Sequence, residues 1–211
     1  MKRFITFVFT VLAVLSMPLS GKSQTLKEVL DNKDLPVYYF GMDFTKAHLL
    51  GDAGANTQDI VDRQYAAIND VIVNEPKKYD LAGAFRRADI KTDLSAVHKR
   101  NSKIDPDKII STSSEDYGRL TEAEVKSLIK GFDAGNKSGT GVLFVVDAMS
   151  KTEKAVNLWV TIFDIKTKKV LLTERVESPL GMGFGFRNYW ASSFKKLIDN
   201  ISNKKYKEWT R

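Results

Sequence analysis

The sequence contains no cysteine and only two histidines, His48 and His98. Without cysteine there is no disulfide framework, no thiolate metal ligand and no residue to carry a lipid after export. Asp43, His48 and Asp52 lie close together in the chain, but their spacing matches no zinc-binding pattern. The sequence therefore predicts neither a metal centre nor a lipoprotein.

Long apolar runs are missing too, apart from one at the N-terminus. Phe4 to Leu19 is almost unbroken apolar sequence, preceded by Lys2 and Arg3 and followed by the small residues Ser20, Gly21 and Ser23. These are the parts of a secretory signal peptide, and the run is shorter than the roughly 20 residues of a membrane-spanning helix. We expect residues 1–23 to be removed and residues 24–211 to form a single exported domain, periplasmic or secreted, with no transmembrane segment.

Charge of one sign is not in large excess. The chain has 33 Lys and Arg against 26 Asp and Glu, and residues 1–23 hold three of the positive charges and no acid. A nucleic-acid-binding protein concentrates basic charge on one face, so we expect no nucleic acid partner. Local basic clusters are either solvated surface or attracted to an anionic lipid or polymer of the envelope. They are Arg86, Arg87 and Lys91; Lys99, Arg100 and Lys103; and Lys204, Lys205, Lys207 and Arg211.

Sequence signatures of catalysis and of cofactor binding are also missing. Residues 131–138 resemble a phosphate-binding loop, but Asn136 separates the glycine from the lysine, and Gly135 is expected to cap a preceding helix. No Gly-x-Ser-x-Gly motif occurs. Asp147 and Asp164 end predicted strands and are expected to cap turns. We therefore predict no catalytic residue, no cofactor and no metal ligand.

The first two thirds of the chain predict one strand followed by helices. Residues 35–43 are rich in β-formers and predict a strand. Apolar residues recur at helical spacing over 57–75, and a short helix is expected at 80–87. A capping box at 121–124 starts a helix expected to end near Gly135. Residues 88–118 stay ambiguous: 90–97 suit either a strand or a helix, and 101–117 are mostly loop in character.

The last third is easier to interpret. Residues 141–147 form a near-continuous apolar run, as in a strand covered on both faces. Residues 157–164 predict a strand with Leu158, Val160 and Ile162 on one face and Trp159, Thr161 and Phe163 on the other, and 170–176 return after a turn. A final helix places Trp190 and Phe194 on one apolar face. The sequence predicts an α/β fold (an α+β sandwich) with a mixed sheet, a C-terminal antiparallel three-strand meander, and helices packed on the sheet.

Glycine alternates with aromatic residues just before the final helix. Free backbone N–H groups at the helix start, beside Arg187, would suit an anion or a partner. Alternatively, the glycines allow close backbone approach while Phe184, Phe186 and Trp190 fill the core. We take this segment as the candidate ligand or partner surface. Its residues are Gly183, Phe184, Gly185, Phe186, Arg187, Asn188, Tyr189 and Trp190.

Residues 160–171 and 183–191 resemble uncharacterised secreted proteins of Bacteroidetes-type bacteria, a similarity that covers about residues 140–200. More loosely, the order of elements is similar to the α/β domain shared by the curli-secretion lipoprotein and the N-terminal domain of TolB. In those domains a first strand ends in Asp, like Asp43 here, and an Asp-x-x-Thr/Gly turn precedes the last helix, like 164–167 here. The resemblance implies an envelope adaptor or assembly domain. It implies no catalytic residue and no pore, because the lipidated cysteine and transmembrane strands are missing.

These observations predict a non-enzymatic periplasmic or envelope binding or assembly module. Its expected partner is an envelope protein or an anionic envelope component. The alternative is an envelope hydrolase whose site lies near residues 88–118, with His98 close by.

Overall fold

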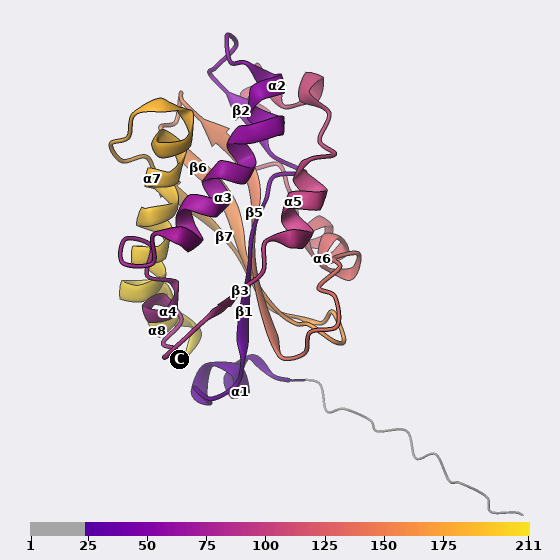
Figure 1. Cartoon of the computed structure of the whole chain (residues 1–211), viewed down its shortest axis with the longest axis vertical. Coiled ribbons are helices and arrows are strands. Elements are labelled where there is room, and N and C mark those ends of the chain that lie inside the picture. The colour runs from indigo at the N-terminus through magenta and orange to yellow at the C-terminus, as the bar shows by residue number, and fades with distance from the viewer. Residues whose placement is uncertain (1–23) are drawn as a thin grey trace, which may run out of the picture.

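The computed structural model describes residues 24–211, and the predicted signal peptide lies outside the described residues. One seven-stranded sheet runs through this part of the chain (Figure 1). The strands are β1 (Val37–Asp43), β2 (His48–Leu50), β3 (Lys91–Thr92), β4 (Ile110–Ser111), β5 (Thr140–Ser150), β6 (Ala155–Asp164) and β7 (Val170–Pro179).

The long strand β5 is the centre of the sheet. One edge of β5 pairs with β6, and the other edge pairs with β1 and then β2, which lie end to end along it. Outside these, β3 pairs with β1 and β4 pairs with β2. The pairings from β3 through β1, β5 and β2 to β4 are all parallel, whereas β6 and β7 are added antiparallel.

The mixed α/β class predicted from the sequence is therefore confirmed. The predicted C-terminal antiparallel pairing is present in β5, β6 and β7. A meander does not describe the sheet as a whole, however, because its path from β3 to β4 is parallel throughout. The error has a physical cause. Parallel pairing joins segments far apart in the chain, and β2, β3 and β4 are only 3, 2 and 2 residues long, too short to show a period-2 pattern.

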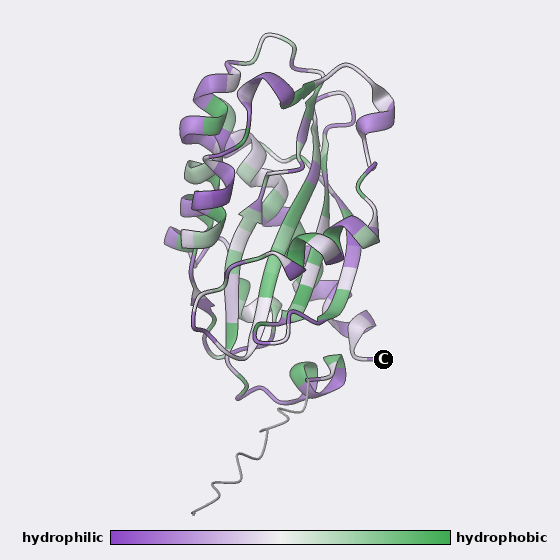
Figure 2. Ribbon diagram, turned by 90° about the vertical axis from the view of Figure 1, so that its right-hand side faces the viewer, coloured by the Kyte–Doolittle hydropathy of each residue, from purple (hydrophilic) through white to green (hydrophobic). Residues whose placement is uncertain are grey.

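Helices cover both faces of the sheet. Val142, Phe144 and Val146 of β5 join a core with the helices on one face, and Leu143 and Val145 point into a second core on the other. Figure 2 shows apolar residues concentrated along the central strands. The α-helices are α1 (Leu26–Asp31), α2 (Thr57–Asp59), α3 (Tyr65–Asn74), α4 (Leu81–Ala84), α5 (Ser95–Asn101), α6 (Glu122–Lys130), α7 (Gly185–Asn200) and α8 (Tyr206–Trp209). Short helical segments of other kinds cover Ile60–Gln64, Pro106–Lys108, Ser114–Asp116 and Ile201–Lys205.

Residues of α3 and α7 pack in the first core, and residues of α6 pack in the second. The capping box that starts α6 is present: the Thr121 hydroxyl accepts from the Glu124 N–H, and the Glu124 carboxylate accepts from the Thr121 N–H. The helix ends earlier than predicted, with Gly131 as its C-cap. Gly135 instead occupies a turn, with φ +62°, where its N–H donates to Asp133.

Candidate functional site

The sheet is interrupted between β1 and β2, and a cavity opens at this point. Asp43 pairs with Val145 and His48 with Ala148, so the chain between β1 and β2 carries two more residues than the matching stretch of β5. On the outer edge the chain leaves the sheet after β3, forms α5, and returns at β4. The extra residues and the α5 excursion border an open cavity of about 610 Å³.

Two buried asparagines replace the hydrogen bonds that the interrupted strand loses. The Met42 N–H donates to Asn69 Oδ1 at 2.7 Å, and the Phe44 N–H donates to Asn101 Oδ1 at 2.9 Å. The Met42 carbonyl accepts from both side-chain amides. Gly41, with φ +95°, leaves room for Asn69, whose Oδ1 a Cβ there would overlap. Buried backbone groups are thus paired although the ladder is broken.

Asp43, at the carboxyl end of β1, fixes one wall of the cavity. Its fully buried carboxylate accepts from the Thr45 N–H at 2.9 Å, from the Thr45 hydroxyl, and from Arg100 Nε at 2.5 Å. Arg100 comes from α5, so the ion pair ties this helix to the end of the strand. Because Asp43 balances its charge, Arg100 acts mainly as a structural part of the wall.

Arg119 is positioned by hydrogen bonds that hold the next residue, Leu120, on both sides; we call them the Leu120 clamp. The Leu120 N–H donates to the buried carboxylate of Asp147 at 3.1 Å. The Leu120 carbonyl accepts from Trp159 Nε1 at 3.1 Å and from Arg175. Burial raises the pKa of Asp147, while the Leu120 N–H and Arg175 act in the opposite direction. The expectation that Asp147 caps a turn is wrong, because it lies inside β5 and binds a distant loop. Asp164 does cap its turn, accepting from Thr167.

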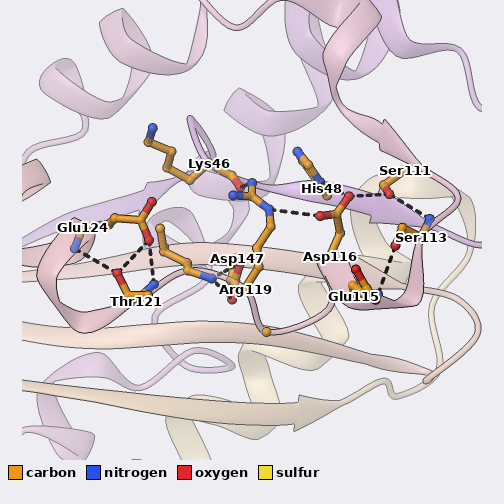
Figure 3. A network of polar contacts seen from close by, with 12 residues as sticks. Lys46, His48, Ser111, Ser113, Glu115, Asp116, Arg119, Thr121, Glu124 and Asp147 are labelled. Atoms are coloured by element: carbon orange, nitrogen blue, oxygen red, sulfur yellow. Dashed lines mark hydrogen bonds and ion pairs between the residues drawn. The ribbon is translucent and has the colours of Figure 1, made fainter.

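The clamp aims Arg119 at the β1–β2 loop. Its Nη2 donates to the Lys46 carbonyl at 2.7 Å, and its Nε lies 3.7 Å from Asp116 Oδ1. Asp116 also accepts from the Ser111 hydroxyl at 2.6 Å and lies 3.0 Å from His48 Nδ1. The Ser111 hydrogen bond, helped by His48 and Arg119, lowers the pKa of Asp116. Figure 3 shows these side chains converging from β2, β4 and the 114–119 segment.

The cavity has a strong excess of positive charge. Its carboxylates are Asp105 and Asp133, and Asp105 already pairs with Lys108 at 2.9 Å. The cationic side chains that line it are Lys46, Lys99, Arg100, Lys103, Lys108 and Arg119. Lys46, Lys99 and Lys103 form no ion pair with any residue in the described range 24–211. The rest of the lining consists of Thr45, His48 and the small or apolar residues Ala47, Ala96, Ile104, Ile109 and Gly131. We call this cavity the basic pocket.

The candidate surface taken from the sequence, residues 183–190, does not line the basic pocket. It forms the loop before α7 and the first turns of that helix, and Figure 1 shows α7 on the other side of the molecule from α5 and α6. Trp190 is buried and Phe186 packs partly against the core. Phe184 is 94% exposed, so the interpretation that it fills the core is wrong. Gly183, Phe184, Arg187 and Asn188 instead border a separate shallow hollow.

The remaining candidates from the sequence are dispersed. Asp43, His48 and Asp52 each contact a different partner, namely Arg100, Asp116 and Lys151. Among residues 24–211, no group of three or more His, Cys, Asp or Glu side chains is arranged to hold a metal ion. His98 Nε2 lies 3.3 Å from Asp70 Oδ1 of α3, and His98 does not line the basic pocket.

Sequence reasoning singled out three residues of the basic pocket, but it did not predict a cavity there. Lys99, Arg100 and Lys103 stood out as a basic cluster, but Lys46 and Arg119 carried no signal because each is a lone cation in a loop. In the region that the structure covers, no helix is both long and apolar enough to cross a membrane. Comparison with protein-family models, curated proteins and solved structures found no match.

Proposed function

We propose that the protein is a non-enzymatic envelope module that binds an anionic group in the basic pocket. The observation that carries this proposal is the set of lysines facing the pocket without ion pairs, Lys46, Lys99 and Lys103. Placing like charges together costs free energy unless counter-ions or a ligand balance them. An anionic ligand would supply that balance.

The site is largely preformed, which favours binding. The Asp43–Arg100 pair fixes α5, and the Leu120 clamp fixes Arg119, so the walls are ordered before a ligand arrives. Arginine suits bidentate contact with a carboxylate or phosphate, and lysines supply flexible point charges. A cavity of about 610 Å³ falls in the size range of small-ligand sites. The apolar lining suits a ligand whose anionic group sits on a larger body.

The position of the basic pocket in the fold also supports ligand binding. In open α/β sheets, ligands bind beyond the carboxyl ends of parallel strands. The basic pocket borders the carboxyl end of β1, where Asp43 and the loop that follows it lie. Together with the expected export of the chain, this favours a phosphorylated or carboxylated envelope component as the ligand. An adaptor or assembly role, as the sequence resemblance implies, is compatible with such binding.

Charge reversal at the pocket tests the proposal. Calorimetric titration with tripolyphosphate and with citrate, at low salt and at about 0.15 M salt, measures affinity for the two kinds of anion. Lys99→Glu with Lys103→Glu reverses two exposed charges that make no hydrogen bond or ion pair within residues 24–211. The matched control is Lys204→Glu with Lys207→Glu, which changes net charge equally at exposed sites near the C-terminus.

We expect the wild type and the control to bind at least one of the two anions, and the pocket variant to bind it about tenfold or more weakly, since about 1.4 kcal/mol corresponds to tenfold. Equal affinity of the pocket and control variants would show that the anion binds elsewhere. No binding by the wild type at low salt would remove the basis of the proposal.

A further inference from the structure

Two large apolar side chains stand out of the molecule on the loop before α7. Met182 is 98% exposed and Phe184 is 94% exposed, and they are the exposed large hydrophobic residues of the described range 24–211. Large apolar side chains exposed side by side on a soluble domain mark contact sites. The basic pocket does not explain them, because neither residue lines it.

The loop displays these side chains in a fixed way. The Gly181 N–H donates to the Ser192 hydroxyl at 2.8 Å, and the Lys196 ammonium donates to the Leu180 carbonyl at 2.6 Å. Gly183 lies so close to α7 that a Cβ there would overlap the Asn188 carbonyl. Glycines therefore face the helix while Met182 and Phe184 face outward, and little further ordering is needed on contact.

Positive charge surrounds the apolar pair. The hollow that Met182 and Phe184 border is also lined by Lys78, Arg187, Lys195 and Lys196, with Glu75 as its one carboxylate. Lys78 pairs with Glu75 and Lys195 with Asp199, which leaves the charges of Arg187 and Lys196 without ion pairs among residues 24–211. The start of α7 adds to this field, because its first turn has no acidic residue and no side-chain cap.

We infer that this loop, residues 181–187, docks the protein on the surface of an anionic lipid bilayer. Met182 and Phe184 enter the headgroup boundary, while Arg187 and Lys196 contact lipid phosphates. A bilayer fits the site better than a protein partner does. A stable protein interface buries about 800 Å² on each side, whereas here the exposed apolar surface is two side chains ringed by cations.

Vesicle co-sedimentation tests this inference on the protein purified in its exported form. We expect it to sediment with vesicles of equimolar phosphatidylglycerol and phosphatidylcholine, and much less with pure phosphatidylcholine. Met182→Ser with Phe184→Ser should lose most of this binding and keep the wild-type circular dichroism and Tm, since both side chains are exposed. Lys204→Gln with Lys207→Gln is the charge control for Arg187→Gln with Lys196→Gln, and only the latter should weaken binding.

A fluorescent label gives an independent readout. The chain has no cysteine, so a single introduced cysteine is the only site that the dye can label. An environment-sensitive dye on Phe184→Cys should shift to the blue on addition of anionic vesicles, whereas the same dye on Thr112→Cys, an exposed site on another loop, should not. Equal sedimentation of wild type and Met182→Ser with Phe184→Ser would overturn the inference. So would the absence of a shift at position 184.

Discussion

Asn69 and Asn101 are buried side chains that take the place of strand partners between β1 and β2. Each accepts from one backbone N–H and donates to the Met42 carbonyl. A break in a buried β-strand normally leaves backbone N–H and C=O groups without hydrogen-bond partners. Each such unpaired group costs about 1–3 kcal/mol of stability. The loop that carries Lys46 and His48 into the basic pocket therefore depends on two amides outside it.

Asn101→Ala should lower the free energy of unfolding by about 2–3 kcal/mol, because the Phe44 N–H loses its partner and the Met42 carbonyl loses one of two. Urea denaturation measures the change. Asn203→Ala, at an exposed position, is the control and should stay within about 0.5 kcal/mol of the wild type. A similar small effect of Asn101→Ala would mean that the loop finds other partners.

Asp147 gives a second prediction, on pH. Its folded-state pKa is raised above the ordinary 3.8, chiefly by burial. As pH rises through 3.8 the unfolded chain ionises first, so the contribution of Asp147 to stability falls until the folded state has ionised as well. The unfolding free energy of Asp147→Asn relative to wild type should therefore increase with pH above about 4 and then level off.

Denaturation curves at several pH values check this, with Asp107→Asn at an exposed carboxyl as the reference series. A relative stability of Asp147→Asn that falls with rising pH would mean that Leu120 and Arg175 outweigh burial.

At the scale of elements, the sequence indicated the long helices and strands and the short helix α4, and it missed the short strands β2, β3 and β4. The capping box at Thr121 and the apolar face of α7 are local patterns, so β1, α6 and α7 could be predicted. The structure of segment 88–118 could not be predicted, because β3 and β4 are strands only through their pairing with β1 and β2. The basic cluster of Lys99, Arg100 and Lys103 could be seen in the sequence. That it faces a cavity could not, because this depends on how α5 leaves the sheet.

The loop before α7 supplies an element-scale prediction. Gly183→Ala should lower the free energy of unfolding by about 1–3 kcal/mol, because its Cβ would overlap backbone atoms of Asn188 that cannot move independently of α7. Gly54→Ala is the matched control, since a Cβ there meets nothing within 4 Å. Thermal and urea unfolding of the two variants check this. If both variants behave like the wild type, the loop is not held against the helix.

At the scale of the whole molecule, two features lie on different sides of the molecule. The basic pocket lies beside α5, and the loop 181–187 leads into α7, with α3 between the two helices and in contact with both. Under the two proposals, one side of the molecule would contact a bilayer and another would hold an anionic ligand. The modest net charge of the chain is thus less informative than its distribution.

The most direct test of the central claim is the position of the bound anion, measured by backbone amide NMR shifts during titration with tripolyphosphate or citrate. The account predicts that saturable shifts gather at residues 45–48, at 99–109 and at Arg119, and that Lys99→Glu with Lys103→Glu needs about tenfold or more anion to reach the same shifts. Shifts that gather at residues 181–188 instead, or that spread evenly over the surface lysines, would contradict it.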